Sequence, residues 1–558
     1  MNRPRALCTS ISEGEATDTA HDLPAKFGKI LTEEFDGDEF IDRAGVDDAT
    51  AESSVTTGMD ILESVVPNRE VEPQSFQPTS WSCCHRRFEP GSPRRFGLLD
   101  PRQLSCCRHI YATMSPRGNP AAWQEPEAIE HAVEEVEGRS RPLDGPGDLD
   151  GLVDYLADRQ FVLLGEASHG TSEFYRWRAQ LSARLIEEHG FDFVAVEGDW
   201  PSCYILNRFV KGRPDAPKTV REALETFTRW PTWMWANWET VEFFEWLALH
   251  NREFEDDPAG FYGLDVYSLF ESMDAVVEHL EATDPGAVEF ARDAYRCFEP
   301  YGEDAREYGR STRLVPETCE DEVVDVLTRL REEAPTYDGD ESPDEQFNVE
   351  QNARVARNAE EYYRSLAGSG NSWNVRDRHM ADTLDRLIEQ HGDDATAIVW
   401  AHNTHIGDAR ATDMAQRGRL NIGQLVRERY PPKEVALVGF GSHHGSVIAA
   451  DEWGAEMESM RVPEAMEGSY EDVFHRAGGE DRLLFTGRIA AGDALAEERG
   501  HRAIGVVYHP SLESGNYVPT ELRERYDAFI HIDESGSLHP LDLHPDREQV
   551  PELYPFGR

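Results

Sequence analysis

The stretch FVLLGEASHGT, residues 161–171, decides the fold of this chain. Its first half is a short apolar run, which is typical of a strand buried on both faces. Its second half is a polar turn, in which Gly165 and Gly170 let the backbone bend tightly. A helical pattern follows directly over residues 172–189. A strand, a turn and a helix in this order predict a unit of an α/β sheet.

More apolar runs of the same kind lie downstream, and helical patterns such as residues 240–251 separate them. This alternation predicts an α/β fold with a largely parallel sheet flanked by helices. The acidic stretch 300–348 is poor in strand signals, so we expect a helical insertion or lid region there. The other predicted strands are Phe193–Glu197, Phe261–Asp265, Thr396–His402, Val435–Phe440, Ala503–Tyr508 and Ala528–Ile532.

Residues 1–113 differ in composition from the remainder of the chain. Residues 1–80 are acidic and show little periodicity, whereas residues 81–109 are rich in arginine and carry two adjacent cysteine pairs. Adjacent cysteines match poorly the spacing at which two thiolates share one zinc ion. We therefore expect residues 1–113 to be a disordered leader or an extension from a mis-assigned start, with Met114 opening a segment of ordinary composition. Residues 114–558 then form the α/β domain.

The formal net charge of -52 on 558 residues is far from the usual balance of a globular protein. The carboxylates are spread along the chain, and salt screens the repulsion between such groups. We interpret the acidity as halophilic adaptation. The same charge repels phosphates, so DNA and RNA are not expected partners.

The sequence also predicts a cytoplasmic compartment. No apolar stretch reaches the roughly 18 residues typical of a membrane span. The first residues lack the apolar core of a secretory signal. Eight cysteines in a chain of this size do not suggest a disulfide framework.

Ionisable side chains follow four of the predicted strands. In open α/β sheets ligands bind beyond the carboxyl ends of the strands, so we expect these side chains to meet at one edge. Burying several ionisable groups together costs stability, and such grouping is typical of functional sites. The residues are Glu166, His169, Glu197, Asp265, His402 and His405.

His169 is the residue best suited to activate water. A neutral imidazole can take a proton from water, and a carboxylate from Glu166 or Glu197 would fix its tautomer. Arg178, on the following helix, could clamp a substrate oxygen or a developing oxyanion. It could equally form an ordinary ion pair with Glu197. Serine chemistry is not expected, because the chain has no G-x-S-x-G elbow.

Other patterns leave alternatives open. His402 and His405 could bind a metal together with Glu166 and Glu197, although no H-E-x-x-H motif is present. The glycine-rich segment 439–445, GFGSHHG, matches no phosphate-binding pattern, and we interpret it as a loop that shapes the pocket. Trp230, Trp233, Trp235 and Trp238 form either core packing or an apolar wall for a bulky substrate.

Over residues 120–545 the chain resembles the erythromycin esterase family. The motif GEASHG at residues 165–170, the arginine nine positions after His169, the segment VAVEGDWP around Glu197 and AHNTH at residues 401–405 follow the family's order and spacing. Segments 504–508 and 514–517 look like the family's late strand and loop. The acidic composition fits a haloarchaeal-type homologue.

The resemblance implies an α/β core with a helical lid over a cleft. It also implies hydrolysis of an ester or macrolactone by activated water, without an obligatory metal or other cofactor, as in antibiotic inactivation. His169 would be the general base, with Glu166 and Glu197 supporting it. Arg178, His402 and His405 would position the substrate and stabilise the oxyanion.

Asp265 and Trp200, which follow their strands, complete the expected substrate-binding residues. The expected partner is a small ester or lactone, but the family name does not fix which one. Two alternatives remain: a metal-dependent hydrolase using the same glutamates and histidines, and a non-catalytic binder of a small hydrophobic ligand.

Overall fold

The computed structural model describes residues 126–541, except for residues 215, 255–257, 302–304, 313–317, 334–342 and 368–370. The predictions for residues 1–113, including the cysteine pairs, lie outside the described residues. Among the described helices, none has both the length and the apolar character needed to cross a lipid bilayer.

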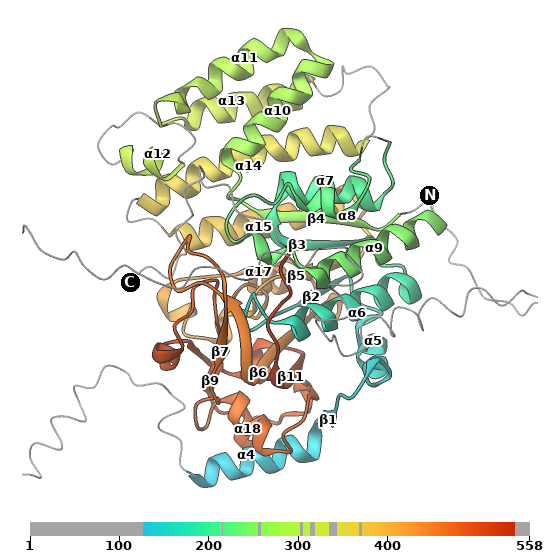
Figure 1. The fold of residues 1–558 in the computed structure, drawn as a ribbon, viewed down its shortest axis with the longest axis vertical. Helices are drawn as coiled ribbons and strands as arrows, with labels where there is room; N and C mark the ends of the chain where they lie inside the picture. Colours follow the sequence, from blue (N-terminus) through green and yellow to red (C-terminus); the bar gives the residue numbers. More distant parts are fainter. Residues whose placement is uncertain are drawn as a thin grey trace, which may run out of the picture. The chain divides into compact units, whose positions relative to one another are not determined.

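Six parallel strands form the centre of the main sheet, in the order β11-β6-β2-β5-β3-β4 (Figure 1). This arrangement confirms the predicted α/β class. Their apolar, non-alternating sequences suit strands that are covered on both faces. The strands are β2 Phe161–Leu164, β3 Phe193–Asp199, β4 Gly260–Asp265, β5 Ala397–Trp400, β6 Val435–Ala449 and β11 Ala528–Ser535.

Antiparallel strands extend the sheet beyond β11 and β6. Strand β8, Arg482–Phe485, pairs with β11 and with the short β1, Arg141–Pro142. Strand β7, Glu458–Val462, pairs with the outer half of β6. Strands β9, Arg499–Arg502, and β10, Tyr517–Thr520, form a separate two-stranded ribbon.

Two segments differ from their predicted form. Residues 503–508 make only isolated bridges, because the preceding residues pair with β10 and the Ile504 N–H donates to the Ala167 carbonyl at 2.8 Å. The apolar run therefore packs behind the turn after β2 instead of forming a strand. The glycine-rich segment 439–445 is not a loop but part of β6, because β11 continues beside it as far as the pair Gly445 and Ser535.

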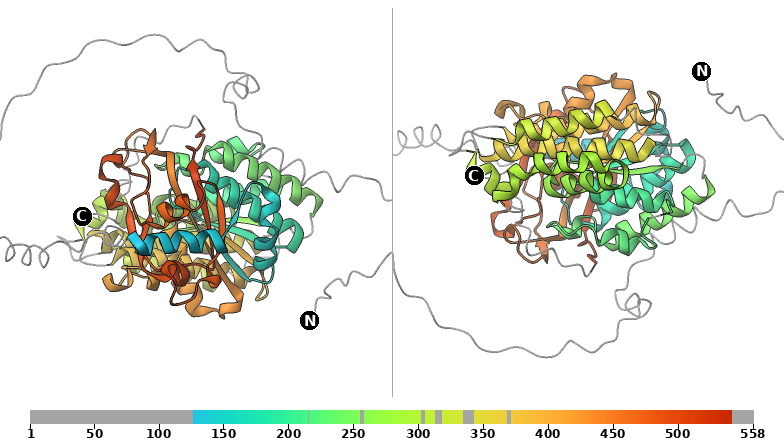
Figure 2. Two further views of the ribbon diagram at one scale, coloured as in Figure 1. Left: turned by 90° about the horizontal axis from the view of Figure 1, so that it is seen from below. Right: turned by 90° about the horizontal axis from the view of Figure 1, so that it is seen from above.

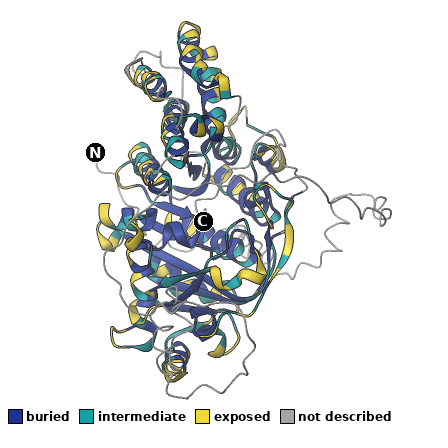
Figure 3. Cartoon of the chain, turned by 90° about the vertical axis from the view of Figure 1, so that its left-hand side faces the viewer, coloured by how far each residue is buried: buried dark blue, intermediate teal, exposed yellow. Residues whose placement is uncertain are grey.

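Helices cover both faces of the sheet, and the strands between them are buried (Figure 3). Helices α5 Asp150–Leu156, α6 Ser172–His189 and α9 Trp238–Glu253 share one apolar core. Helices α4 Pro126–Arg139, α15 Ser372–His391, α17 Ile422–Arg429 and α18 Tyr470–Arg476 share the core on the other face. Helix α7, Trp200–Val210, contributes to both cores. In the left view of Figure 2, which is seen from below, the blue helix α4 crosses in front of the red and orange strands.

A group of helices between β4 and α15 has an apolar core of its own. These helices begin at residue 269, upstream of the predicted insertion at 300–348. Helix α14 packs against α15 and α7, which joins the group to the sheet. Cys297 and Cys319 form a disulfide within it, a link that the sequence did not suggest. The helices are α10 Leu269–Thr283, α11 Pro285–Tyr295, α12 Ala305–Ser311, α13 Glu320–Glu333 and α14 Pro343–Ala367.

Candidate active site

The turn between β2 and α6 carries two of the predicted site residues and lies against neighbouring backbone and side chains. A Cβ on Gly165 would lie 2.1 Å from Asn403 Oδ1, and one on Gly170 would lie 1.9 Å from the Ile448 carbonyl oxygen. Position 170 therefore requires glycine, because backbone atoms approach it closely, whereas at Gly165 the close atom belongs to the Asn403 side chain. The turn is fixed against the loop after β5, which brings the β2 and β5 ends together.

His169, Glu166 and Arg178 form a buried chain of contacts. His169 Nδ1 lies 2.9 Å from Glu166 Oε1, and Arg178 Nη2 lies 2.7 Å from Glu166 Oε2. The Arg178 guanidinium also packs over the rings of Tyr175 and Trp400. Arg178 therefore pairs with Glu166 and not with Glu197. Arg178 holds Glu166 in place, and Glu166 in turn orients the His169 ring.

Glu197, at the end of β3, is surrounded by donors. Its Oε1 accepts from Arg376 Nη2 at 2.7 Å, and its Oε2 accepts from the backbone N–H of His402 at 2.9 Å. Burial alone would raise its pKa, but His405, Arg376 and His169 outweigh burial and hold the Glu197 pKa well below its ordinary range. Glu197 is therefore a persistent negative charge and a poor proton acceptor.

Arg376, on α15, is a site residue that the sequence reasoning missed. Its Nε and Nη2 donate to the two oxygens of Asp265 at 2.9 and 2.6 Å. The same Nη2 also donates to Glu197, so one guanidinium joins the ends of β3 and β4. The search for polar residues after strands could not find it, because it lies within a helix. Its burial is known only from the structure, so the sequence carried no signal for it.

His405 is held behind Glu197 rather than at the cleft. Its Nδ1 lies 2.9 Å from Asp377 Oδ1, its Nε2 lies 3.4 Å from Glu197 Oε1, and its ring stacks on Trp373. Burial opposes protonation, but Asp377 and Glu197 together raise the His405 pKa. His405 thus links Asp377 to Glu197, and Arg376 Nη1 donates to its Nε2 at 3.1 Å. Asp377 is a second helix residue that the sequence reasoning missed.

His402 lies beside His169, with 4.9 Å between the ring centroids. Burial and the neighbouring His169 lower the His402 pKa well below its ordinary value, despite the opposing effects of Glu197 and the Ala167 carbonyl. The Thr404 N–H donates to His402 Nδ1 at 3.2 Å, which places the proton of the neutral ring on Nε2. That Nε2 is buried and makes no well-formed hydrogen bond to the described residues. It lies next to the His169 ring, behind the cleft surface.

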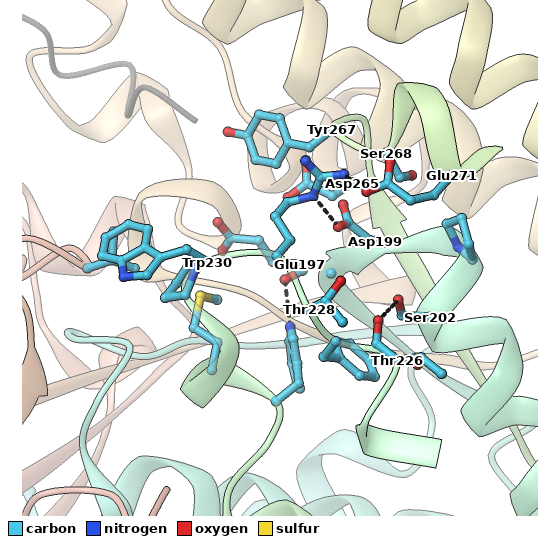
Figure 4. Close-up of a pocket in the computed structure, with 18 of the residues that line it drawn as sticks. Glu197, Asp199, Ser202, Thr226, Thr228, Trp230, Asp265, Tyr267, Ser268 and Glu271 are labelled. Atoms are coloured by element: carbon cyan, nitrogen blue, oxygen red, sulfur yellow. Dashed lines mark hydrogen bonds and ion pairs between the residues drawn. The ribbon is translucent and has the colours of Figure 1, made fainter. Parts of the chain in front are cut away.

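A cleft with a volume of about 110 Å³ opens over these groups. His169, Glu197, Asp265 and Arg376 lie at its base. Figure 4 shows Trp230 on one side and Asp199, Asp265 and Glu271 clustered on the other. The remaining aromatic and sulfur-containing lining comes from Phe227, Met234, Trp235, Tyr267 and Trp453.

The four tryptophans between residues 230 and 238 divide between the two predicted roles, core packing and an apolar wall of the cleft. Trp230 and Trp235 line the cleft, whereas Trp233 is buried without lining it and Trp238 packs against the core. Trp230 also packs against Trp453 from a distant segment, with 4.6 Å between ring centroids. An apolar wall therefore exists, and core packing holds it in place.

Asp199 sits at the acidic side of the cleft. Arg229 Nε lies 2.8 Å from its Oδ2, and Arg229 also pairs with Glu271. Burial, with Glu271 and Asp265 adding to it, raises the pKa of Asp199 to about 6 in spite of Arg229. This side of the cleft therefore gains negative charge near neutral pH.

The structure brings most of the predicted residues together, but not all at the cleft surface. His169, Glu197 and Asp265 line it, while Glu166, Arg178, His402 and His405 lie behind.

Trp200 is elsewhere: as the first residue of α7 its side chain turns to the opposite core. There it stacks on Tyr262 and donates from Nε1 to Asn348 at 2.9 Å. It does not line the cleft, so the substrate-binding role expected for it lacks support.

The predicted metal alternative also lacks a suitable arrangement. Glu166, Glu197, His402 and His405 are not among the described residues whose ligand atoms could share one ion. The lone pairs of both glutamates point instead to Arg178, Arg376 and the His402 backbone.

Comparison with known proteins agrees with this fold and its motifs. The profile of the erythromycin esterase family matches residues 186–535, more than half of the sequence. The chain belongs to the erythromycin esterase family. The matched region contains Glu197, Asp265, Arg376, His402 and His405, while Glu166, His169 and Arg178 precede it. The resemblance predicted from the sequence motifs is confirmed.

Individual members of this family and its structural neighbours are distant. The erythromycin esterase type II of Escherichia coli is 22% identical over 420 residues, covering 71% of this chain and 94% of the relative. A crystal structure of a succinoglycan biosynthesis protein has a TM-score of 0.61 and 20% identity, covering 75% of this chain and all of that one. A mutant of the erythromycin esterase EreC in its open conformation has a TM-score of 0.54 and 18% identity, covering 70% of this chain and 94% of that one. These structures share the fold, and the family makes the chain a hydrolase.

Proposed function

We propose that this hydrolase cleaves a carboxylic ester or lactone with water that His169 activates. The observation that carries the proposal is the Glu166–His169 contact of 2.9 Å at the base of the cleft. Because Glu166 accepts the Nδ1 proton, His169 Nε2 keeps its lone pair for a proton from water. Glu197 also lines the cleft, but its lowered pKa makes it the weaker base.

The proposed reaction has two steps, the addition of water to the carbonyl carbon and the loss of the alcohol. His169 Nε2 takes one proton from water as the water oxygen bonds to the ester carbonyl carbon, and the carbonyl oxygen becomes an oxyanion. The bond from carbon to the alcohol oxygen then breaks, and the protonated His169 returns its proton to the leaving alkoxide. Glu166 stabilises the imidazolium between these steps, as a carboxylate does in other histidine-based sites.

His402 is the proposed partner of the oxyanion. Its Nε2–H is buried next to His169, and a hydrogen bond formed only when the oxygen becomes negative would favour the transition state. Arg178 acts through Glu166 and does not touch the substrate, because its guanidinium lies behind that carboxylate. His405, Asp377 and Asp265 hold Glu197 and Arg376 in place.

The cleft favours a substrate with an apolar body and polar or cationic groups. Trp230, Trp235 and Met234 offer apolar surface, while Asp199 and Glu271 face the same space. A macrolide lactone is one compound of this kind, and antibiotic inactivation is one role that follows from it. Simple aryl and alkyl esters test the reaction class without assuming that role.

The test is a hydrolysis screen of esters and lactones at molar salt, with and without a chelator. We expect turnover of at least one ester or lactone, and an unchanged rate after chelation at temperatures well below unfolding. Loss of turnover that returns only with added metal would favour the metal-dependent alternative. Ligand binding with no turnover across the panel would contradict hydrolysis and favour a binding protein.

A further inference from the structure

Three histidines that the proposed reaction does not use lie together outside the cleft lining, two of them in the glycine-rich segment 439–445. His443 and His444 belong to the outer half of β6, and His475 belongs to the last turn of α18. One ring nitrogen from each lies within 4.8 Å of those of the other two. His443 is buried, while His444 and His475 are partly exposed. An ion can therefore reach the cluster from solvent.

The ring nitrogens lie close enough to share one small cation, which requires the His475 ring to turn out of its parallel stack on His443. Nδ1 of His443 and Nδ1 of His444 lie 3.0 Å apart, and the His443 and His475 rings stack with 3.7 Å between centroids. Two nitrogens bound at 2.0–2.1 Å to one tetrahedral zinc ion are about 3.3 Å apart. The observed spacing is close to that value. Three imidazoles with a fourth position open to water form a ligand set typical of zinc.

A carboxylate supports the cluster from a third element. Asp533 Oδ1, on β11, lies 2.7 Å from His475 Nδ1 and 3.7 Å from Nε2 of the fully buried His531. A metal-binding histidine commonly donates its other ring N–H to a carboxylate, which fixes the tautomer and the ring orientation. With Asp533 on Nδ1, His475 keeps the Nε2 lone pair for an ion.

The backbone that carries the ligands is fixed before any ion binds. His444 pairs with Glu534 in the β6–β11 register, and Arg502 Nη1 donates to the carbonyls of Ser442 and His443 at 2.7 and 2.6 Å. Ligands on rigid elements lose little freedom on binding, which favours affinity.

We propose that His443, His444 and His475 bind one divalent transition-metal ion of the zinc class, with Asp533 positioning His475. The ion joins β6 to α18 and so stabilises the fold on the side of β11. It does not take part in hydrolysis, and its binding does not depend on the proposed ester chemistry.

The test measures zinc bound to full-length protein after chelator treatment and dialysis against zinc. Cysteine pairs elsewhere in the chain can bind zinc too, so the readout is the difference between wild type and His443→Gln/His475→Gln. We expect the double variant to bind one zinc equivalent fewer per chain. The matched control is His189→Ala, which removes an exposed histidine at the end of α6 and should leave the zinc content unchanged. Equal zinc content in wild type and the double variant would overturn the proposal.

Two further measurements guard against a variant that simply fails to fold. Zinc should raise the midpoint of thermal unfolding of chelator-treated wild type, and the double variant should lose that rise while keeping its circular dichroism spectrum. Asp533→Asn should weaken zinc binding by about 10–100-fold while leaving the ligands in place. A zinc-dependent rise that persists in the double variant would also overturn the site. Ester turnover is measured separately, so its absence would leave the zinc result interpretable.

Discussion

Glu166 and Glu197 are both buried glutamates beside His169, and their contacts give them different tasks. Glu166 touches the imidazole directly and is itself held by Arg178. Glu197 faces the cleft, but its two oxygens accept hydrogen bonds from Arg376 and from the backbone N–H of His402. The sequence placed both carboxylates near His169 without distinguishing them, because the distinction depends on a helix, α15, that is distant in sequence.

Arg376 is the residue whose removal should cost most at this site. Arg376→Met leaves Glu197 and Asp265 as buried carboxylates without their shared cation, so we expect a loss of about 3–5 kcal/mol in the free energy of unfolding. Denaturant unfolding at fixed salt measures the loss. Arg378→Met, an exposed position two residues along the same helix, is the control and should change stability by less than about 0.5 kcal/mol. Equal effects of the two substitutions would contradict the assigned role of Arg376.

Glu471, on α18, gives a pH prediction. Burial opposes its ionisation, but His501 at 2.6 Å and Arg502 lower the pKa of Glu471 from 4.5 to about 2. A group whose pKa is lower in the folded protein than in the unfolded chain stabilises the fold. This stabilisation is complete above the pKa of the unfolded chain and is lost as pH falls towards the pKa of the folded protein. Wild type should therefore have a higher free energy of unfolding than Glu471→Gln at pH 6. The difference between the two proteins should narrow as pH falls from 4.5 towards 2. Unfolding curves measured over that range, with the exposed Glu456→Gln as control, check the direction. A gap that widens on acidification would contradict the lowered pKa.

At the scale of elements, the turn after β2 shows why a few glycines matter more than others. Gly170 lies against the Ile448 backbone, whereas Gly138 in α4 has open space around the position of a Cβ. The sequence indicated a tight turn, but only the packing shows which segment the turn lies against.

Alanine substitutions at these two glycines should have opposite effects. Gly170→Ala should destabilise the protein and displace His169, since the new methyl group would overlap backbone atoms. Gly138→Ala should raise stability by up to about 1 kcal/mol, because alanine is the better helix former. Thermal unfolding and ester turnover measure both effects. A Gly170→Ala protein as stable and active as wild type would show that the turn is not fixed by this contact.

Sequence patterns predicted the strands at the centre of the sheet better than the short or polar strands outside it. The runs that became the six central parallel strands were recognisable because burial on both faces demands continuous apolar sequence. The short β1 and the polar β7 and β9 carry no such signal, and the apolar run 503–508 forms no strand because its backbone partners belong to the turn after β2. Arg376, Asp377 and the His443–His475 stack depend on contacts between distant segments, which periodicity does not report.

At the scale of the whole molecule, the net charge of -52 should make stability depend on salt. We propose that the chain is adapted to high salt, since screening weakens the repulsion among dispersed carboxylates. The midpoint of thermal unfolding should rise markedly between low and molar potassium chloride. Sucrose at matched water activity is the control and should give a smaller rise. A midpoint independent of salt would contradict halophilic adaptation.

The most direct test of the account compares turnover by wild type and His169→Ala on the best ester or lactone from the screen, at molar salt. We predict a fall in kcat of at least about 100-fold, the range expected for loss of a general base, with an unchanged circular dichroism spectrum. Equal rates for the two proteins would contradict it.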